Sequence, residues 1–378
     1  MHSMYKECNP TPALSPKMLL FNEDLAKEIN LHYLIENSNE RLDILSGNKL
    51  IKDSKPIAFA YSGHQFGHFN PNLGDGRALL LGEILDQQGK LKDIQLKGSG
   101  RTPFSRRGDG KSALGPVLRE YLISESMHIL GIPTTRSLAA INTGEKVHRD
   151  EETYGGIMTR VASSHIRIGS FEYAYKNKDI SVVKDLADYS ISRHYPDTAS
   201  LDNPYLAFFA AVCNEQASLV ASWMTVGFIH GVMNTDNMAI SGETIDYGPC
   251  AFMDAYDPAT VFSSIDVNGR YAYGNQPAIL TWNLTRLAET LIPLVNKDKD
   301  ESIKLLTEVL QLIKPVYTNY WLSLMRSKIG LSKEEQNDIE LITNLLEIME
   351  EEKADFTNSF RLLSKALIGE TQSIRNLF

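Results

Sequence analysis

One polar stretch decides the fold: His230-Gly231-Val232-Met233-Asn234-Thr235-Asp236-Asn237-Met238-Ala239-Ile240-Ser241-Gly242-Glu243-Thr244-Ile245-Asp246. It holds three candidate metal or proton ligands, Asp236, Asn237 and Asp246. Short apolar runs around Ser241-Gly242 predict a hairpin with a polar side chain at each open end, ended by positive φ at Gly248. Oxygen ligands of this kind suit Mg²⁺, which takes one or two from protein and others from phosphate. Asp and Asn are also typical of turns, so the rest of the chain must choose between a metal site and a turn.

Composition and charge narrow the class of protein. The 378 residues are 43% hydrophobic and 22% charged, which is typical of a globular protein of two or three domains. The net charge of −9 disfavours nucleic acid as a partner. The three cysteines form no Cys-x-x-Cys pair, so neither a zinc ribbon nor a disulfide framework is expected. With no signal-peptide pattern and no apolar run of membrane-spanning length, we expect a cytoplasmic protein without a membrane partner.

A glycine turn and a strand lysine form the next feature. Leu73-Gly74-Asp75-Gly76-Arg77 predicts a tight turn, and Ala78–Ile84 and Lys92–Lys97 predict paired strands after it. A lysine at a strand end beside a glycine-rich loop can reach phosphate oxygens. The alternative for Lys97 is an ordinary solvated lysine, which is the default for that residue type.

The segment from Gly98 to Lys111 is rich in glycine and arginine. Free backbone N–H groups and guanidinium groups in one loop suit a bound phosphate, and a mobile basic surface loop is the alternative. The apolar spacing of Ser112–Leu130 predicts a helix. Glu120 on that helix is placed either to pair with Lys97 or to make an exposed ion pair of little energetic value.

Further along the chain, strands give way to helices. Thr134–Asn142 and Gly155–Val161 predict strands of the same sheet, and Arg160 on the second, with Arg167 beyond it, would add to an anion site. His64 and His68 have helical metal-ligand spacing, but the glycines around them argue against a helix and no third ligand adjoins. Helices are predicted at 182–194, at 204–226 and through most of 277–378.

This order of parts resembles that of a protein kinase. A glycine-rich turn, a strand lysine, a helix glutamate, a loop Asp-Asn and a final Asp-x-Gly follow one another. The fold predicted is therefore α+β and kinase-like, with two lobes. It comprises an N-terminal extension (1–55), a strand-rich N-lobe (56–178) and a helical C-lobe (179–378). The loop departs from the kinase pattern because it has no His-Arg-Asp.

Several motifs together are similar to those of the SelO family, also called YdiU, of protein adenylyltransferases. The similarity runs from about residue 5 to about residue 290. It rests on Asn9-Pro10-Thr11-Pro12, Gly63-His64-Gln65-Phe66-Gly67-His68, Leu73-Gly74-Asp75-Gly76-Arg77, Gln95-Leu96-Lys97-Gly98, Arg119-Glu120-Tyr121, His230-Gly231-Val232-Met233-Asn234-Thr235-Asp236-Asn237 and Asp246-Tyr247-Gly248-Pro249.

The resemblance implies a pseudokinase fold that binds ATP in a flipped orientation with Mg²⁺ or Mn²⁺. It implies transfer of AMP to Ser, Thr or Tyr hydroxyls of proteins, and UMP transfer from UTP has also been ascribed to bacterial members. By resemblance, Asp236 is the proton acceptor, Asn237 and Asp246 are the metal ligands, and Glu120 is the ion-pair partner of Lys97. The implied nucleotide-binding set is Gly74, Gly76, Arg77, Lys97, Asp109, Gly110, Arg160, Arg167 and Asp246.

Two departures from the family pattern concern the end of the chain and its cysteines. The chain is short for the family and ends at Asn376-Leu377-Phe378, with no cysteine near that end or at Thr260–Ser263. We therefore expect no redox tether between those regions, and Cys250 to be a buried, inert thiol. A shortened C-terminal helix set would weaken stability or protein-substrate docking. A true phosphotransferase and a non-catalytic nucleotide-binding scaffold stay open as alternative functions.

Overall fold

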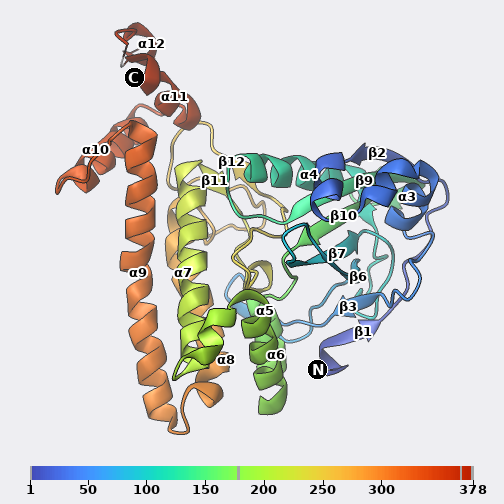
Figure 1. The fold of residues 1–378 in the computed structure, drawn as a ribbon. Helices are drawn as coiled ribbons and strands as arrows, with labels where there is room; N and C mark the ends of the chain where they lie inside the picture. The colour runs from blue at the N-terminus through green and yellow to red at the C-terminus, as the bar shows by residue number, and fades with distance from the viewer. Residues whose placement is uncertain (1, 177–178, 367, 376–378) are drawn as a thin grey trace. The chain divides into compact units, whose positions relative to one another are not determined.

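A computed structural model describes residues 2–176, 179–366 and 368–375 (Figure 1). The structure is mixed α and β, with a multi-strand antiparallel sheet and many helices. It divides into two compact units. Unit 1 comprises Met1–Phe208, Asn234–Tyr247 and Glu289–Lys297, and unit 2 comprises Phe209–Met233, Gly248–Ala288 and Asp298–Phe378. The kinase-like lobes with boundaries at residues 55 and 178 stay a prediction.

The strands are β1 Tyr5–Glu7, β2 Lys17–Phe21, β3 Ile57–Phe59, β4 Gly63–Gln65, β5 His68–Asn70, β6 Ala78–Leu85, β7 Leu91–Lys97, β8 Ser112–Ala113, β9 Arg136–His148, β10 Glu152–Ala162, β11 Phe228–Ile229 and β12 Ala251–Phe252. The helices are α1 Glu23–Glu28, α2 His32–Glu36, α3 Ser38–Leu45, α4 Leu114–Ile129, α5 Ile168–Lys176, α6 Ile180–His194, α7 Pro204–Thr225, α8 Gln276–Val295, α9 Lys299–Ile329, α10 Asp338–Glu351, α11 Phe356–Ala366 and α12 Gln372–Arg375.

Unit 1 is built around one sheet with the strand order β1-β3-β6-β7-β10-β9-β2. Every pairing along this path is antiparallel, including β6 with β7 and β7 with β10. The four predicted strands at 78–84, 92–97, 134–142 and 155–161 are confirmed as β6, β7, β9 and β10, and the predicted helix at 112–130 as α4.

The two faces of this sheet are covered by different helices (Figure 1). On one face, apolar residues of α1 to α3 such as Leu25 and Leu45 join Leu96, Leu138 and Ile157 of the strands in one buried cluster. On the other face, a smaller cluster contains residues of α4, β9 and β10: Val117, Ala140 and Met158. Successive residues of a strand point to opposite faces of the sheet. Side chains on the same face as Met158 therefore point toward α4.

The predicted hairpin at 238–245 is only partly present. Met238 and Thr244 form one antiparallel bridge, but the two arms mainly pair elsewhere. One arm bonds to the segment at 166–168 and the other to 133–135. The positive φ expected at Gly248 is instead at Asp246, whose φ is 62°. Positive φ is uncommon for a residue other than glycine, although aspartate adopts it more readily than most residue types.

Unit 2 is largely helical, as predicted for most of the chain after residue 277. Its short β11–β12 pair is fixed by Gln276 at the start of α8, whose side chain accepts from the His230 N–H at 3.0 Å and donates to the Phe228 carbonyl at 2.9 Å. Phe356 of α11 stacks on Tyr256 with ring centroids 5.8 Å apart. Residues 376–378, the chain end at which the sequence indicates a shortened helix set, lie outside the described residues.

Two further expectations concern membranes and thiols. Among the described residues, no helix combines the length and the apolar character needed to cross a membrane. Cys250 is fully buried, as expected.

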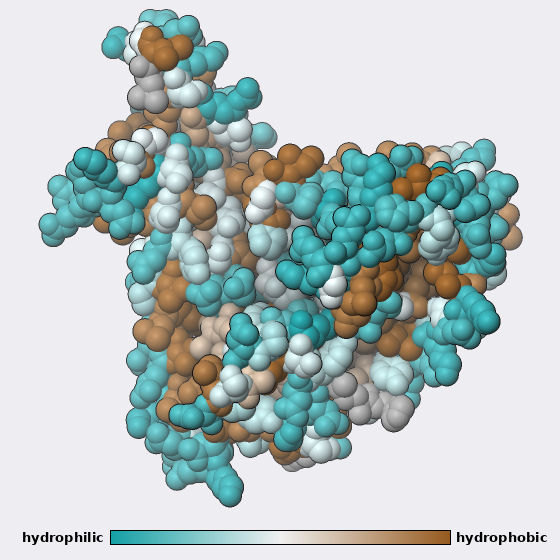
Figure 2. All heavy atoms as spheres, in the orientation of Figure 1, coloured by the Kyte–Doolittle hydropathy of each residue, from teal (hydrophilic) through white to brown (hydrophobic). Residues whose placement is uncertain are grey.

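On the face seen in Figure 2, hydrophilic side chains predominate over the part of unit 1 that carries α3.

The sheet core gives a direct stability prediction. Leu138 is 0% exposed within the larger cluster, whereas Leu85, in β6 of the same sheet, is 55% exposed. Leu138→Ala should lower the free energy of unfolding by about 2–5 kcal/mol, because it leaves a cavity. Leu85→Ala is the matched control and should change it by less than about 0.5 kcal/mol. Urea unfolding followed by circular dichroism measures both, and equal losses would contradict the assigned core.

Candidate functional site

Strand alternation places three polar side chains on the α4 face of the sheet. In the register of β7 with β10, Arg160 lies opposite Gln95 and Met158 lies opposite Lys97. Residues two apart on a strand share a face, so Gln95 and Lys97 of β7 lie on the same face as Arg160. Glu120 is on the buried side of α4, which covers that face. The sheet pairing and one helix thus bring these four residues together.

These residues form a network of ion pairs with Asp246. Lys97 Nζ donates to Glu120 Oε2 at 2.7 Å and to Asp246 Oδ1 at 3.1 Å. Arg160 Nη1 donates to the same Asp246 oxygen at 2.7 Å and to Glu120 Oε1 at 3.3 Å. Arg160 also donates from Nη2 to Gln95 Oε1 at 2.6 Å. Two carboxylates and one amide therefore fix both cations.

Arg167 joins the network from the segment between β10 and α5. Main-chain bonds between Ile168 and Met238 and between Ile240 and Ile166 hold this segment. Arg167 Nη2 donates to Asp246 Oδ2 at 3.1 Å, and its guanidinium lies 4.7 Å from the Tyr61 ring centroid. Asp246 therefore receives a third cation on its second oxygen.

Asp75 extends the network to the glycine turn. Its Oδ1 lies 3.8 Å from Arg167 Nη1, and its Oδ2 accepts from the Phe59 N–H and from Gln95 Nε2. Burial raises the pKa of the Asp75 carboxyl, and Arg167 opposes that rise. Asp75 is therefore a second buried carboxyl that contacts Arg167.

The electrostatics of Asp246 follow from these contacts. Burial alone would raise the pKa of its carboxyl, but Arg160, Lys97 and Arg167 outweigh burial and hold the pKa well below its usual range. The Arg160 and Arg167 side chains are each 1% exposed. Buried charges need partners, and Nε of Arg167 has no hydrogen-bond partner among the described residues. Arg167 can therefore donate one more hydrogen bond, from Nε, than it makes with the described residues.

Asp236 lies in the neighbouring 3-10 turn, Thr235–Asn237. Its side chain accepts one hydrogen bond, from Gln65 Nε2 to Oδ2 at 3.1 Å. The other oxygen, Oδ1, is buried without a partner among the described residues. Burial raises the pKa of this carboxyl to about 6, against the lowering effect of the Gln65 bond. An unpartnered carboxylate oxygen with such a pKa is suited to accept a proton near neutral pH.

The β4–β5 hairpin holds this turn, and its histidines are not gathered as metal ligands. The His64 N–H donates to Thr235 Oγ1 at 2.7 Å. The His64 ring and the Thr235 hydroxyl both bind the carboxylate of Glu172 in α5. In the described parts of the chain no group of three His, Cys, Asp or Glu could hold a metal ion. Sequence reasoning missed Gln65 and Glu172, because only the folded hairpin shows which residues they face.

Of the other residues of the implied nucleotide-binding set, Gly74, Gly76 and Arg77 form the glycine turn, and Gly110 lies against Gly100 of the following loop. A Cβ added to Gly74 would meet the Phe104 ring at 2.6 Å, and one added to Gly110 would meet the backbone of Gly100 at 2.1 Å. Arg77 is exposed. Gly76 is half-buried and accepts from the Ser105 hydroxyl. The loop from Gly98 to Lys111 therefore packs closely on the turn.

Asp109 and Asn237, two of the predicted site residues, bind residues outside the ion-pair network of Asp246. Asp109 is bound by Arg149, with Nη1 and Oδ2 2.9 Å apart. Asn237 is half-buried, and its N–H donates to the Asn234 carbonyl at 2.9 Å. The structure thus gathers Lys97, Glu120, Arg160, Arg167 and Asp246 by direct contact. The roles of all the predicted residues toward a nucleotide stay predictions.

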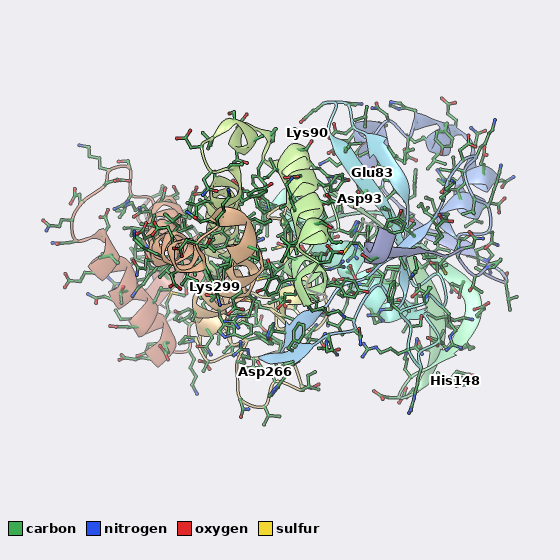
Figure 3. All side chains as sticks on the ribbon, turned by 90° about the horizontal axis from the view of Figure 1, so that it is seen from below. Glu83, Lys90, Asp93, His148, Asp266 and Lys299 are labelled. Carbon is green, nitrogen blue, oxygen red and sulfur yellow. The ribbon has the colours of Figure 1, made fainter. Side chains whose placement is uncertain are left out.

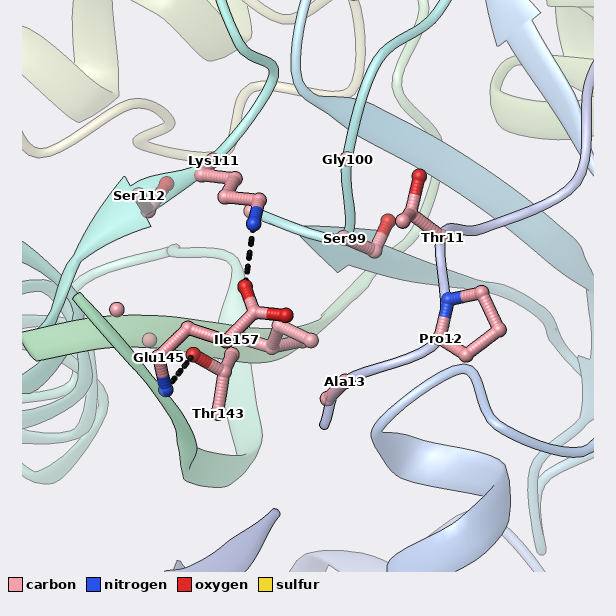
Figure 4. Close-up of a pocket in the computed structure, with 13 residues that line it drawn as sticks. Thr11, Pro12, Ala13, Ser99, Gly100, Lys111, Ser112, Thr143, Glu145 and Ile157 are labelled. Atoms are coloured by element: carbon pink, nitrogen blue, oxygen red, sulfur yellow. Dashed lines mark hydrogen bonds and ion pairs between the residues drawn. The ribbon is translucent and has the colours of Figure 1, made fainter. Parts of the chain in front are cut away.

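A small hollow lies beside the glycine-rich loop (Figure 4). Thr11 to Ala13, Gly98 to Gly100 and residues of β9 and β10 line it, and Lys111 pairs with Glu145 at its wall. Its volume of about 10 Å³ is room for one water at most. This hollow is therefore too small to receive a nucleotide.

Behind Arg167 lies a second buried polar network. The Arg167 guanidinium donates to the His165 carbonyl at 3.2 Å, and the His165 ring Nδ1 lies 2.9 Å from Asp93 Oδ2. Asp93 and Glu83, on neighbouring strands β7 and β6 (Figure 3), both bind the guanidinium of Arg193. Burial lowers the pKa of His165 to about 4. The network fixes the main chain that presents Arg167.

Comparison with known proteins places this site in a family. The family model described as "Protein adenylyltransferase SelO" matches residues 2–377. The protein nucleotidyltransferase YdiU of Brevibacillus brevis is 56% identical over 362 residues, 96% of this chain and 74% of that protein. The protein of the same name from Rhizobium rhizogenes is 56% identical over 95% of this chain and 71% of its own length. That of Cereibacter sphaeroides is 56% identical over 100% and 78%.

The class of protein follows from these matches. The chain is a nucleotidyltransferase. It belongs to the SelO family of protein adenylyltransferases. The resemblance seen in the sequence motifs is thereby confirmed. The chain spans between 71% and 78% of the length of these relatives.

The second network predicts how stability depends on pH. The folded-state pKa of His165, about 4, is below its value in an unfolded chain, about 6.5. The contribution of neutral His165 is therefore full above pH 6.5 and is lost as pH falls toward 4, by on the order of 3 kcal/mol. His165→Asn keeps a donor toward Asp93 and removes the titration.

The measurement is urea unfolding at several pH values between 6.5 and 4.5. His165→Asn should lose less stability across this interval than the unsubstituted chain. Replacement of His128, an exposed histidine of α4, by Asn is the matched control and should leave the slope unchanged. If His165→Asn and the unsubstituted chain have the same slope, His165 is not the titrating group.

Proposed function

We propose that this chain transfers AMP from ATP to the hydroxyl of a Ser, Thr or Tyr side chain on a protein. The observation that carries the proposal is the cluster of Lys97, Arg160 and Arg167 around Asp246, together with a buried Asp236 oxygen that has no partner in the described part of the chain. Three fixed cations suit the oxygens of a triphosphate. A free carboxylate oxygen suits the proton of an attacking hydroxyl.

The reaction would be a single displacement at the α-phosphorus. The acceptor hydroxyl oxygen forms the new P–O bond, the bond to the β-phosphate oxygen breaks, and pyrophosphate leaves. Asp236 accepts the hydroxyl proton at Oδ1. Lys97 and the two arginines stabilise negative charge on the phosphate oxygens and on the departing pyrophosphate, at a site where burial strengthens each charge interaction.

The residues present fit a divalent cation held together with nucleotide phosphates. Asp246 offers a carboxylate and Asn237 an amide oxygen, which is the small protein share that Mg²⁺ takes beside phosphate. Among the described residues no group of three His, Cys, Asp or Glu could hold a metal ion, so phosphate oxygens would have to complete the ligand set of this cation. When bound, Mg²⁺ or Mn²⁺ would neutralise phosphate charge.

Nucleotide binding would have to redistribute the partners of Asp246. Its two oxygens are bound by three cations in this structure. The phosphate groups of ATP offer Lys97, Arg160 and Arg167 alternative anionic partners, and the Asp246 carboxylate then becomes available to a cation. The kinase-like two-lobed fold and the flipped orientation of ATP belong to this proposal as well, together with nucleotide contacts by Gly74, Gly76, Arg77, Asp109 and Gly110.

Two alternatives use the same parts. UMP transfer from UTP needs the same phosphate chemistry, so the base of the nucleotide separates it from AMP transfer. A phosphotransferase would expose the γ-phosphorus to the acceptor. The Asp236 oxygen without a partner among the described residues favours catalysis over a scaffold that only binds nucleotide. A buried acceptor atom without a donor lowers stability, and a role as proton acceptor would explain why it is retained.

A double-label experiment tests the proposed function. The chain is incubated with Mg²⁺ or Mn²⁺, casein as acceptor, and ATP labelled at either the α- or the γ-phosphate. We expect protein labelling from the α-position and none from the γ-position, because AMP is the transferred group. Asp236→Asn and Asp246→Asn should each lower the initial rate by about a hundredfold or more.

The controls separate lost chemistry from lost folding. Asp24→Asn replaces an aspartate whose side chain is 95% exposed and should leave the rate unchanged. Thermal unfolding of each variant shows whether it is folded at the assay temperature. Label from the γ-phosphate alone would make the chain a kinase, and ATP binding without any labelling would make it a scaffold. Competition by UTP against labelled ATP ranks the two nucleotides.

A further inference from the structure

The contacts of the β4–β5 hairpin converge on the turn that carries Asp236. Three groups of the hairpin bind three consecutive residues, Asn234, Thr235 and Asp236. The Phe66 N–H donates to Asn234 Oδ1 at 3.2 Å, and the His64 N–H donates to Thr235 Oγ1 at 2.7 Å. The hairpin therefore binds the two residues that immediately precede Asp236.

Gln65 makes the third contact, and it is the one to the carboxylate itself. Its amide Nε2 donates to Asp236 Oδ2 at 3.1 Å. Asp236 is 7% exposed, so its oxygens have little water to bind. With Oδ2 held by Gln65, Oδ1 is the oxygen left without a partner among the described residues.

The surroundings of Oδ1 are shaped by a glycine of the same hairpin. A Cβ added to Gly63 would lie 2.4 Å from Asp236 Oδ1, so any larger residue at position 63 would collide with the carboxylate. Gly169 approaches the same residue from α5, where an added Cβ would lie 3.2 Å from the Asp236 Cα. The two glycines let the backbone close around Asp236 without a side chain that would bond to Oδ1.

We propose that Gln65 is a positioning residue for the transfer reaction: its amide fixes the Asp236 carboxylate through Oδ2 and so selects Oδ1 as the atom that accepts the hydroxyl proton. This inference rests on the proposed function of Asp236. Gln65 acts through Asp236 alone, whereas the phosphate-facing cations are held by Glu120, Gln95 and Asp246. Loss of the amide frees the carboxylate to rotate and leaves both oxygens without a donor.

The effect should appear in turnover and not in nucleotide affinity. Gln65→Met has nearly the same volume and shape but no N–H donor. We expect the initial rate at saturating ATP to fall between about tenfold and a hundredfold, the range typical of a residue that orients a functional group. The ATP concentration at half-maximal rate should stay within about twofold of its original value.

A double-mutant cycle distinguishes positioning from a general structural role. If Gln65 works through Asp236, Gln65→Met should cause almost no further loss of rate in the Asp236→Asn background. A merely structural role would lower the rate by the same factor in both backgrounds. The same loss in both, or no loss in the single variant, overturns the proposal.

Two further variants secure the experiment. Gln87→Met makes the same change at an exposed glutamine whose amide donates to the Lys27 carbonyl at 2.9 Å, and it should keep full activity. If Gln65→Met is unfolded at the assay temperature, Gln65→Asn takes its place. It keeps the amide but shortens its reach by one methylene, and it should show the same dependence on Asp236.

The proposed function and the role of Gln65 fail in different ways. If the unsubstituted chain transfers no label from the α-phosphate, the proposed function is wrong before Gln65 is considered. If the chain is labelled and Asp236→Asn abolishes labelling while Gln65→Met does not lower it, the proposed function stands and the positioning role is wrong.

Discussion

The structure of the site depends on one constraint: three cations, two of them buried guanidinium groups, share the carboxylate of Asp246. Lys97, Arg160 and Arg167 come from three separate segments, and each bonds to Asp246. Removing ions of this kind from water costs several kcal/mol each, so the segments must stay together for the charges to be compensated. The positive φ of Asp246 fits this picture, because the ion pairs can hold the backbone in a conformation that it would otherwise avoid.

The same constraint explains why the sheet and α4 are built as they are. Strand alternation sends apolar side chains such as Leu96 and Ile157 to the face covered by α1 to α3. It sends Gln95, Lys97 and Arg160 to the opposite face, where α4 supplies Glu120. The large core cluster lies on the first face, so stability and charge are kept on different faces of the same strands. A substitution in the larger core therefore need not alter the charged cluster directly.

Part of this arrangement could be predicted from the sequence, for identifiable reasons. The β6 and β7 strands and helix α4 follow from local periodicity, and a strand-end lysine beside glycines already indicated an anion site. The hairpin expected at 238–245 is only partly present, because its arms bond more extensively to 166–168 and 133–135 than to each other. Those partners are distant in sequence, and no local sequence pattern predicts the pairing. For the same reason the sequence did not show that Gln65 faces Asp236 across 171 residues.

The two parts of the site differ in their balance of hydrogen-bond donors and acceptors. This difference is relevant to how the site would bind a nucleotide and an acceptor hydroxyl. Around Asp246 there are more donors than acceptors: two buried guanidinium groups and an ammonium group share three carboxylates, one amide and one main-chain carbonyl, and Arg167 Nε has no partner among the described residues. Around Asp236 there are fewer donors than acceptors: the Gln65 amide donates to Oδ2, and Oδ1 has no donor within the part of the chain that the structure describes. An anion with many acceptor oxygens relieves the first imbalance, and a hydroxyl donor relieves the second. A triphosphate and a hydroxyl are the two reactants of nucleotidyl transfer, so the unsatisfied groups of the resting site complement the pair of substrates that the proposed reaction joins.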